Sequence, residues 1–211
     1  MLFVTATDTD VGKTYFSKSL LSKLLEQMPK EKLAYYKPIQ CGKPTDYDVI
    51  KELGIDTHCS YDLTYPASPD YAASLEGVEI KLEKILDDFQ KLKAQYDFIL
   101  VEGAGGLAVP INKTEMISDL AKALNLETIL VIRPDLGTIN HSILSLEHIK
   151  AKGLKLKGIY VSGKHRDLSL AYELSDEERS KQNSAALKSI LEFSQAKEIS
   201  LDEIAYGYQL H

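Results

Sequence analysis

Lysine, threonine and glycine residues near the start of this sequence form a pattern that suits phosphate binding. Gly12-Lys13-Thr14 stands between a short apolar run at residues 2–6 and an amphipathic stretch. In such a loop, backbone N–H groups and a helix N-terminus bind phosphate oxygens, the lysine reaches the terminal phosphates, and the threonine hydroxyl binds Mg²⁺. The tripeptide alone is a weak signal, but its place between a strand and a helix is the context that a phosphate loop requires.

An acidic residue and a glycine-rich turn follow a second apolar run, at residues 97–101. Glu102 follows this run directly, and Gly103-Ala104-Gly105-Gly106 comes after Glu102. A carboxylate at the end of a buried strand is where a Walker B acid holds Mg²⁺, and glycines let the backbone approach a ligand closely. Taken alone, the segment is equally well an ordinary strand end with a turn. Together with the phosphate loop, it favours a nucleotide site.

A lysine and two aspartates follow a third run, at residues 32–38. Lys37 lies at the end of this predicted strand, and Asp46 and Asp48 come after it. Parallel strands end at one edge of a sheet, so Lys37 is expected to face the phosphate loop. Either aspartate could be a second metal ligand. The alternatives are a surface lysine and acidic residues that balance charge at a helix start.

A fourth segment follows the run at residues 127–132. Gly137 and Thr138 open a predicted helix, so its free N–H groups could bind a carboxylate or a phosphate. The alternative is simple helix capping by Thr138 and Asn140.

The elements that must position these residues alternate between strand and helix. Continuous apolar strands that alternate with amphipathic helices predict a mostly parallel central sheet with helices on both faces, an α/β fold of the P-loop NTPase type. Residues 1–211 are expected to form one such domain. We expect strands at 2–6, 32–38, 97–101, 127–132 and 157–162, helices at 16–25, 48–53, 78–95, 116–124, 138–152 and 175–193, and an irregular functional loop at 55–76.

Composition narrows the class further. The chain has 211 residues and a hydrophobic content of 44%, which are ordinary values for a globular protein. Its net charge of −6 gives it no bulk attraction for nucleic acid or for anionic lipid. No apolar run approaches the ~20 residues that span a bilayer, and the N-terminus has no signal-peptide pattern. Cys41 and Cys59 fit neither a disulfide framework nor a zinc site, so we expect two free thiols in a reducing cytoplasm.

With these segments in hand, the sequence resembles the dethiobiotin synthetase family. The matches stay in order and cover residues 1 to about 162, and together they are specific. They are A-T-D-T-D-V-G-K-T at residues 6–14, K-P-I-Q-C-G at 37–42, P-A-S-P at 66–69, V-E-G-A-G-G at 101–106 and G-T-I-N-H at 137–141.

The resemblance implies a reaction. One amine of 7,8-diaminononanoate (7,8-diaminopelargonate) takes up CO₂, supplied as CO₂/bicarbonate, as a carbamate. A carbamate oxygen then attacks the γ-phosphate of ATP to give a carbamic–phosphoric anhydride. The second amine closes the ureido ring, which yields dethiobiotin, ADP and phosphate. No protein nucleophile is required, so the work of the protein is positioning and charge neutralisation.

The resemblance also implies residue roles. Lys37 and Lys13 are the catalytic cations, and Mg²⁺ is held by Thr14, Asp48 and Glu102. Asp48 is preferred to Asp46 because Asp48-Val49-Ile50 matches the acidic residue that opens an apolar helix in the family. Nucleotide binding is assigned to Asp10, Val11, Gly12, Lys13, Thr14, Tyr15, Asp48, Glu102, Gly103, Ala104, Gly105, Ser162 and Gly163, and substrate binding to Thr9, Cys41, Gly137, Thr138, Ile139 and Asn140.

The family is a homodimer with active sites at the interface. Residues 137–140 match the segment that binds the substrate carboxylate from the neighbouring subunit. We therefore expect a homodimer, with no nucleic-acid or membrane partner.

Four departures from the family pattern matter. Ala6 replaces a glycine, Asp10 replaces a common glutamate, and Cys41 stands where a serine or threonine is usual. At the purine end, Ser162-Gly163 replaces an Asn-Asp pair, and no G-x-I-P segment is visible from residue 199 onward. A serine offers one hydroxyl where asparagine offers a donor and an acceptor to the adenine edge. The sequence therefore predicts weak discrimination between ATP and GTP.

Three other classes remain as alternatives. A switch ATPase of the chromosome-partitioning type shares the loop and the fold, but the loop here lacks the extra lysine of that class. A cobyrinate-type amidase needs a glutaminase domain, for which 211 residues leave no room. A binding-only paralogue would keep the nucleotide site without turnover.

Overall fold

Six parallel strands form a single sheet in a computed structural model that describes residues 1–163 and 176–208. The strand order is β3-β2-β4-β1-β5-β6. All five residues of β1 are buried, as expected for a central strand with both faces covered. The strands are β1 (Leu2–Ala6), β2 (Leu33–Cys41), β3 (Asp56–Leu63), β4 (Phe98–Gly106), β5 (Glu127–Ile132) and β6 (Lys155–Val161).

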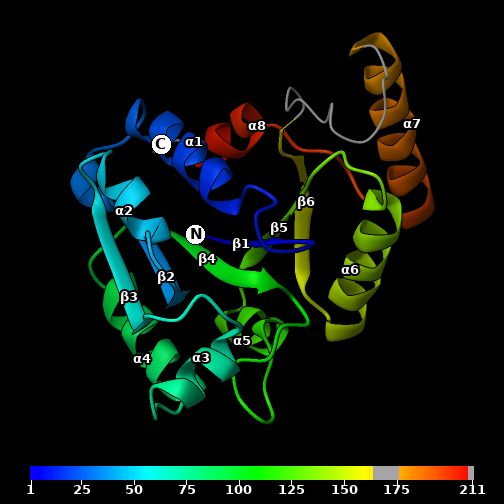
Figure 1. Cartoon of the computed structure of the whole chain (residues 1–211). Coiled ribbons are helices and arrows are strands. Elements are labelled where there is room, and N and C mark those ends of the chain that lie inside the picture. The colour runs from blue at the N-terminus through cyan, green and yellow to red at the C-terminus, as the bar shows by residue number, and fades with distance from the viewer. Residues whose placement is uncertain (164–175, 209–211) are drawn as a thin grey trace.

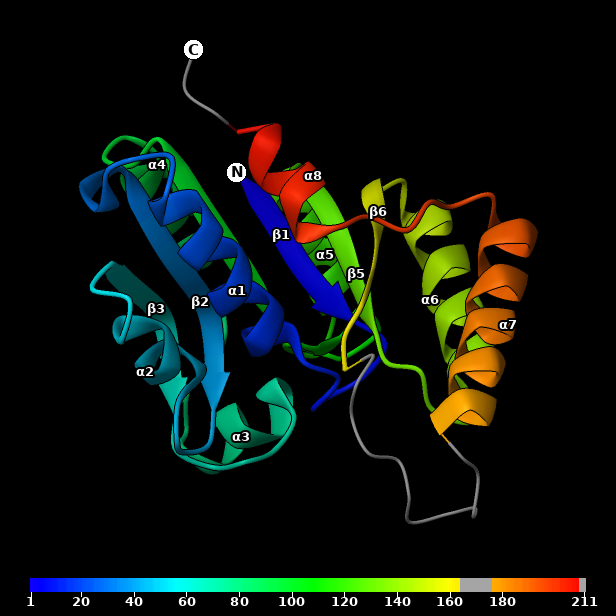
Figure 2. The same cartoon turned by 90° about the horizontal axis from the view of Figure 1, so that it is seen from above.

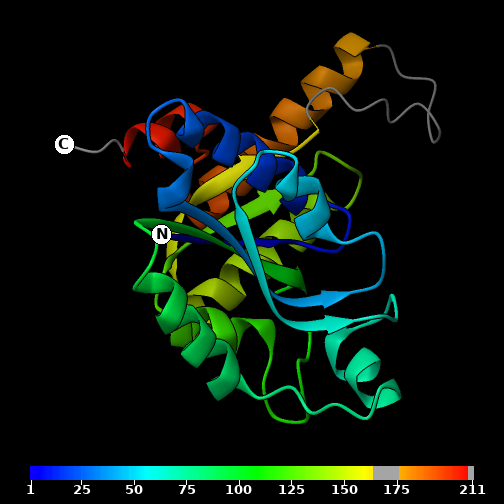
Figure 3. The same ribbon diagram turned by 90° about the vertical axis from the view of Figure 1, so that its left-hand side faces the viewer.

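Helices cover both faces of this sheet (Figures 1 and 2). Two hydrophobic cores lie on the two faces of the sheet. In one core, α1 and α8 pack against the sheet, and in the other, α4, α5, α6 and α7 pack against the opposite face. Figure 3 shows α1 and α8, in blue and red, on one side of the sheet and the green α4 on the other. The helices are α1 (Lys13–Leu25), α2 (Asp46–Lys51), α3 (Pro69–Leu75), α4 (Leu82–Lys93), α5 (Ile117–Leu124), α6 (Thr138–Lys152), α7 (Asp176–Ser194) and α8 (Leu201–Tyr206), with a 3₁₀ turn at Lys30–Lys32.

The structure confirms the predicted fold class, a parallel α/β sheet between helical layers. The prediction of an irregular loop at 55–76 is wrong, because this region holds β3 and α3. β3 is an edge strand that pairs only with β2, and most of its residues are half-buried or exposed. It therefore lacks the continuous apolar run by which a central strand is recognised.

Two helix starts bear on the sequence predictions. α2 begins at Asp46, two residues before the predicted start at 48, because the Thr45 hydroxyl caps it by accepting a hydrogen bond from the Asp48 N–H. The capping box predicted at Ser175 lies outside the described residues.

Within the described ranges, no helix is long and apolar enough to cross a bilayer.

The sheet brings the predicted chemistry to one edge. The phosphate loop follows β1, Lys37 lies in β2, and Glu102 lies in β4. These strands are neighbours in the order β2-β4-β1 and run parallel, so their carboxyl ends lie side by side.

Candidate active site

A cleft of about 980 Å³ opens at the carboxyl ends of β1, β2 and β4. Its walls come from the phosphate loop and the start of α1, the end of β2 and the start of α2, the segment that leads into α3, and the end of β4 with the turn after it. Such a crevice is where ligands bind in open α/β sheets. The lining residues are Thr9, Asp10, Gly12, Lys13, Thr14, Tyr15, Lys37, Ile39, Gln40, Cys41, Pro44, Asp46, Pro66, Ala67, Ser68, Pro69, Ala104, Gly105 and Val109.

The phosphate loop ends in a helix start built for an anion. Gly12 stands at the N-cap of α1 with a φ of +108°, and no side chain of the described residues caps this helix. The N–H groups of the first turn are therefore free to bind phosphate oxygens. Lys13 is buried, and its Nζ donates to the Asp8 carbonyl oxygen at 2.9 Å. Burial, and then the positive charge of Lys37, lower the pKa of Lys13 to about 8.

Four side chains form one polar cluster at the floor of the cleft. Thr14 Oγ1 lies 2.9 Å from Asp46 Oδ1 and 3.1 Å from Glu102 Oε1. Lys37 Nζ lies 2.6 Å from Asp46 Oδ2 and 3.1 Å from Glu102 Oε1, and it donates to the Gly103 carbonyl oxygen at 3.0 Å. The cluster therefore brings two carboxylates, a hydroxyl and an ammonium group within hydrogen-bond distance of one another.

Electrostatic attraction keeps Lys37 and Asp46 of this cluster charged. Burial opposes the charged forms of Lys37 and Asp46, but their attraction outweighs it. The pKa of Lys37 is raised by the nearby Glu102 and Asp46, and the pKa of Asp46 is lowered by Lys37 and by the Thr14 hydroxyl. Glu102 is fully buried and also accepts a hydrogen bond from Ser17 Oγ at 2.5 Å.

The structure places the two aspartates in different surroundings. Asp46, rather than the predicted Asp48, lies beside Thr14 and Lys37. Asp48 instead contacts the Thr45 hydroxyl and lies 3.1 Å from Lys51 Nζ on the exposed side of α2. The reason is the two-residue shift in the start of α2, which turns Asp46 toward the cleft and uses Asp48 in the cap.

Comparisons with known proteins give this site a family. A family model described as an AAA domain matches residues 1–200. The ATP-dependent dethiobiotin synthetase BioD of Methanococcus vannielii is 42% identical, over 77% of this chain and 78% of its own length. The enzyme of the same name from Methanococcus aeolicus is 38% identical, over 97% of this chain and 99% of its own length. The chain belongs to the dethiobiotin synthetase family.

A comparison with solved structures shows that the fold of this chain is shared with another protein. The MinC:MinD cell division protein complex of Aquifex aeolicus matches with a TM-score of 0.56 and 15% identity, over 99% of this chain and 86% of that chain. At this identity the likeness shows a shared fold and nothing about activity.

Nine of the nineteen residues that the dethiobiotin synthetase resemblance assigned to nucleotide or substrate line the cleft. Thr9, Asp10, Tyr15 and Cys41 line it. Ala104 and Gly105 also line it. Val11 packs into the core, and the carbonyl oxygen of Gly103 accepts a hydrogen bond from Lys37.

Two predicted segments lie outside the lining of this cleft. Gly137, Thr138, Ile139 and Asn140 form the start of α6, and Thr138 lines a separate cavity of about 520 Å³ beside α7. Ser162 lies against the phosphate loop: a Cβ atom added at Gly12 would stand 2.1 Å from Ser162 Oγ. Gly163 follows it with a φ of +68°.

The sequence predictions left out several residues of the site. Ser17 lies one helical turn after Lys13 and hydrogen-bonds to Glu102, and Gln40 lines the cleft next to Cys41. Asp46 was named from the sequence as an alternative to Asp48, and its place in the first turn of α2 could have been read from Thr45 and Asp48, which have the spacing of a helix cap. Ser17 and Gln40 give no comparable signal, since each is a common residue inside a regular element.

Proposed function

We propose that this protein is an ATP-dependent dethiobiotin synthetase of biotin biosynthesis, acting on 7,8-diaminononanoate, CO₂ and ATP. The observation that carries this proposal is the meeting of a phosphate loop with the cluster of Thr14, Asp46, Glu102 and Lys37 in one cleft. Membership of the dethiobiotin synthetase family supports the choice of substrate among the many reactions that this fold serves.

The polar cluster fits a divalent cation. Among the described residues, no three His, Cys, Asp or Glu side chains are grouped to hold a metal by themselves. A hydroxyl and two carboxylates converge at Thr14, and such hard oxygen ligands suit Mg²⁺ when phosphate oxygens and water complete its shell. Thr14, Asp46 and Glu102 would hold the ion, which when bound neutralises negative charge on the phosphates.

The two lysines serve the transferred phosphate and the carbamate. Lys13 and the free N–H groups of α1 would bind the β- and γ-phosphates. Lys37 would stabilise charge where the carbamate oxygen approaches the γ-phosphorus, since its ammonium group lies at the floor of the same cleft. The carbamate oxygen displaces ADP, the second amine attacks the carbonyl carbon, and inorganic phosphate leaves. Each amine gives up a proton, and no protein side chain forms a covalent bond.

The diamine chain would extend from this cluster toward Thr9 and Cys41, which line the cleft. Its carboxylate would meet residues 137–140 of a second subunit, because these residues lie outside the cleft of their own chain. We therefore propose a cytoplasmic homodimer of single-domain chains with shared active sites.

The reaction itself is the first test. Purified protein is incubated with 7,8-diaminononanoate, bicarbonate and Mg-ATP, dethiobiotin is detected by mass spectrometry, and phosphate is counted. We expect one phosphate for each ring closed. The matched variant Lys37→Gln, checked for folding by its unfolding midpoint, should lose about 10²- to 10³-fold in rate, as when one preorganised donor to a transition state is removed.

Phosphate release without dethiobiotin, unchanged by the diamine, would overturn the proposal. The protein would then hydrolyse nucleotide for another purpose, as in the switch-ATPase alternative.

A further inference from the structure

Gln40 is a buried amide in the wall of the cleft, with 3% of its surface exposed. It lies near the end of β2, three residues after Lys37. The hydrogen bonds of its side chain go to backbone atoms, including the N–H of Asp46, and not to the side chains of the cluster of Thr14, Asp46, Glu102 and Lys37. All of those bonds go to the backbone of the segment that carries Asp46.

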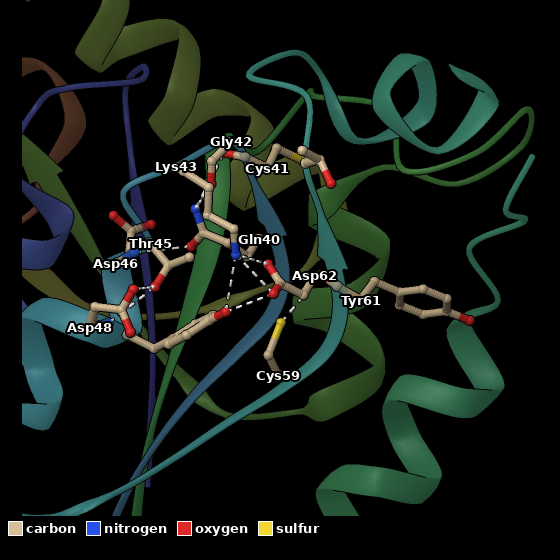
Figure 4. Close-up of polar contacts among 12 residues, drawn as sticks. Gln40, Cys41, Gly42, Lys43, Thr45, Asp46, Asp48, Cys59, Tyr61 and Asp62 are labelled. Carbon is tan, nitrogen blue, oxygen red and sulfur yellow. Dashed lines mark hydrogen bonds and ion pairs between the residues drawn. The ribbon is translucent and has the colours of Figure 1, made fainter. Parts of the chain in front are cut away.

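The carboxamide uses both of its donors and its acceptor within this segment (Figure 4). Nε2 donates to the carbonyl oxygens of Cys41 and Gly42, each at 3.2 Å. Oε1 accepts from the N–H of Asp46 at 3.1 Å. One side chain therefore ties the beginning of the β2–α2 connection to its end.

The bond to Asp46 is made at a helix start. Asp46 is the first residue of α2, and its N–H is one of the groups that a helix leaves without an internal partner. The Thr45 hydroxyl serves the N–H of Asp48, so Gln40 supplies the second cap from outside the helix. The backbone of Asp46 is thus held from β2, while its carboxylate contacts Thr14 and Lys37.

We propose that Gln40 is a positioning residue that holds Asp46 in the cluster and thereby sets how strongly a divalent cation enhances nucleotide binding. This inference rests on the proposed function only in that Asp46 is taken as a cation ligand. A ligand held in advance loses less conformational freedom on binding than one that must be ordered.

The variant Gln40→Met tests this, because methionine keeps a similar length and apolar volume but can neither donate nor accept these bonds. The control is Tyr47→Phe. Tyr47 follows Asp46 on the same helix, and its hydroxyl donates to Asp62 Oδ2 at 2.7 Å and accepts from Lys43 Nζ at 3.4 Å. This change therefore also removes tertiary hydrogen bonds from α2, but it leaves those of Asp46 in place.

The first readout is the affinity for a non-hydrolysable ATP analogue, measured by calorimetry with EDTA and again with Mg²⁺. The ratio of the two is the cation enhancement. Gln40→Met should reduce this enhancement at least tenfold while the affinity in EDTA stays within threefold of wild type. Tyr47→Phe should leave both unchanged.

The second readout needs no ligand. Hydrogen exchange of the Asp46 amide, followed by NMR on the full chain, should speed up at least tenfold in Gln40→Met and stay unchanged in Tyr47→Phe. If Gln40→Met does not fold, Gln40→Asn, which keeps the amide but is one methylene shorter, should show both changes to a smaller degree.

The inference is overturned if the Gln40 variants match Tyr47→Phe in cation enhancement, because Gln40 would then be a structural residue only. It is distinguishable from the proposed function, since neither readout involves the diamine. If the wild type forms no dethiobiotin but both readouts are as expected, Gln40 is still a positioning residue, and the protein is a different nucleotide-dependent enzyme.

Discussion

At the scale of single residues, the two cysteines lie on neighbouring strands without facing each other. Cys59 is paired in register with Lys37, and Cys41 with Leu63. Both thiols are free, as the sequence predicted. Cys41 lines the cleft, whereas Cys59 Sγ donates to the Tyr61 carbonyl oxygen. Burial raises the pKa of each thiol to about 11.

This burial predicts how the thiols react. At pH 8, three units below a pKa of about 11, roughly one thiol in a thousand is the reactive thiolate. The alkylation rate by iodoacetamide should therefore rise about tenfold per pH unit from pH 7 to pH 10 for both residues. Peptide mass spectrometry measures each site separately, and occupation of the cleft by a nucleotide analogue with the diamine should protect Cys41 but leave Cys59 unchanged. A rate that levels off near pH 8.5 would contradict the assignment.

The residue scale also shows how far sequence reasoning reached. Lys13, Thr14, Lys37 and Glu102 could be placed together from the sequence because each lies at or near the predicted end of an apolar strand, and parallel strands end at one edge of a sheet. The same reasoning could not predict which of Asp46 and Asp48 faces the cluster, since the two residues are only two positions apart in a short helix. A shift of two residues turns a helix by about 200°, so the helix start decides which carboxylate meets Lys37.

At the scale of elements, the end of β6 meets the phosphate loop through one serine. The Ser162 hydroxyl lies where a side chain at Gly12 would have to go, and Gly12 has a φ of +108° that suits glycine. Ser162 therefore packs against the loop and is not among the residues that line the cleft. This position leaves its hydroxyl poorly placed to recognise a purine edge.

We accordingly expect weak base selectivity. The ratio of kcat/KM for ATP to that for GTP should stay below about 10², which corresponds to roughly 2.7 kcal/mol. Ser162→Ala should leave this ratio unchanged, because the hydroxyl faces Gly12. A ratio of kcat/KM for ATP to that for GTP above about 10², measured by steady-state kinetics, would contradict this prediction.

Elements differed in how readily the sequence predicts them. β4 and β5 are buried on both faces and read as continuous apolar runs. β3 and α8 were missed because β3 lies at an edge and α8 has only six residues. A signal for α8 was nevertheless present, since Ser200 and Glu203 form a capping box.

At the scale of the whole molecule, apolar side chains stand exposed around the start of α6. Leu136 is 80% exposed, Leu144 62% and Ile139 40%. Ile139 lies in the segment 137–140, and Leu136 and Leu144 lie before and after it; the proposed homodimer brings this segment to the neighbouring active site. Several large, exposed apolar side chains on one short stretch of chain favour a protein interface there.

Sedimentation velocity should therefore show a dimer at micromolar concentration. Leu144→Lys should weaken the dimer and make the specific activity fall on dilution, whereas Phe193→Lys, which changes an exposed apolar residue on α7, should not. A wild-type monomer with undiminished activity at nanomolar concentration would exclude a shared active site.

The central position of β1 has a consequence for synthesis of the chain. β1 leads into the phosphate loop and is made before the other strands of the sheet, yet its two neighbours in the sheet are β4 and β5, which end at Gly106 and Ile132. On a ribosome adding about 5–20 residues per second, the loop thus waits on the order of ten seconds before both flanking strands exist. A nascent chain halted before Ile132 should therefore be unable to hold nucleotide, although it already contains Lys13, Lys37 and Glu102.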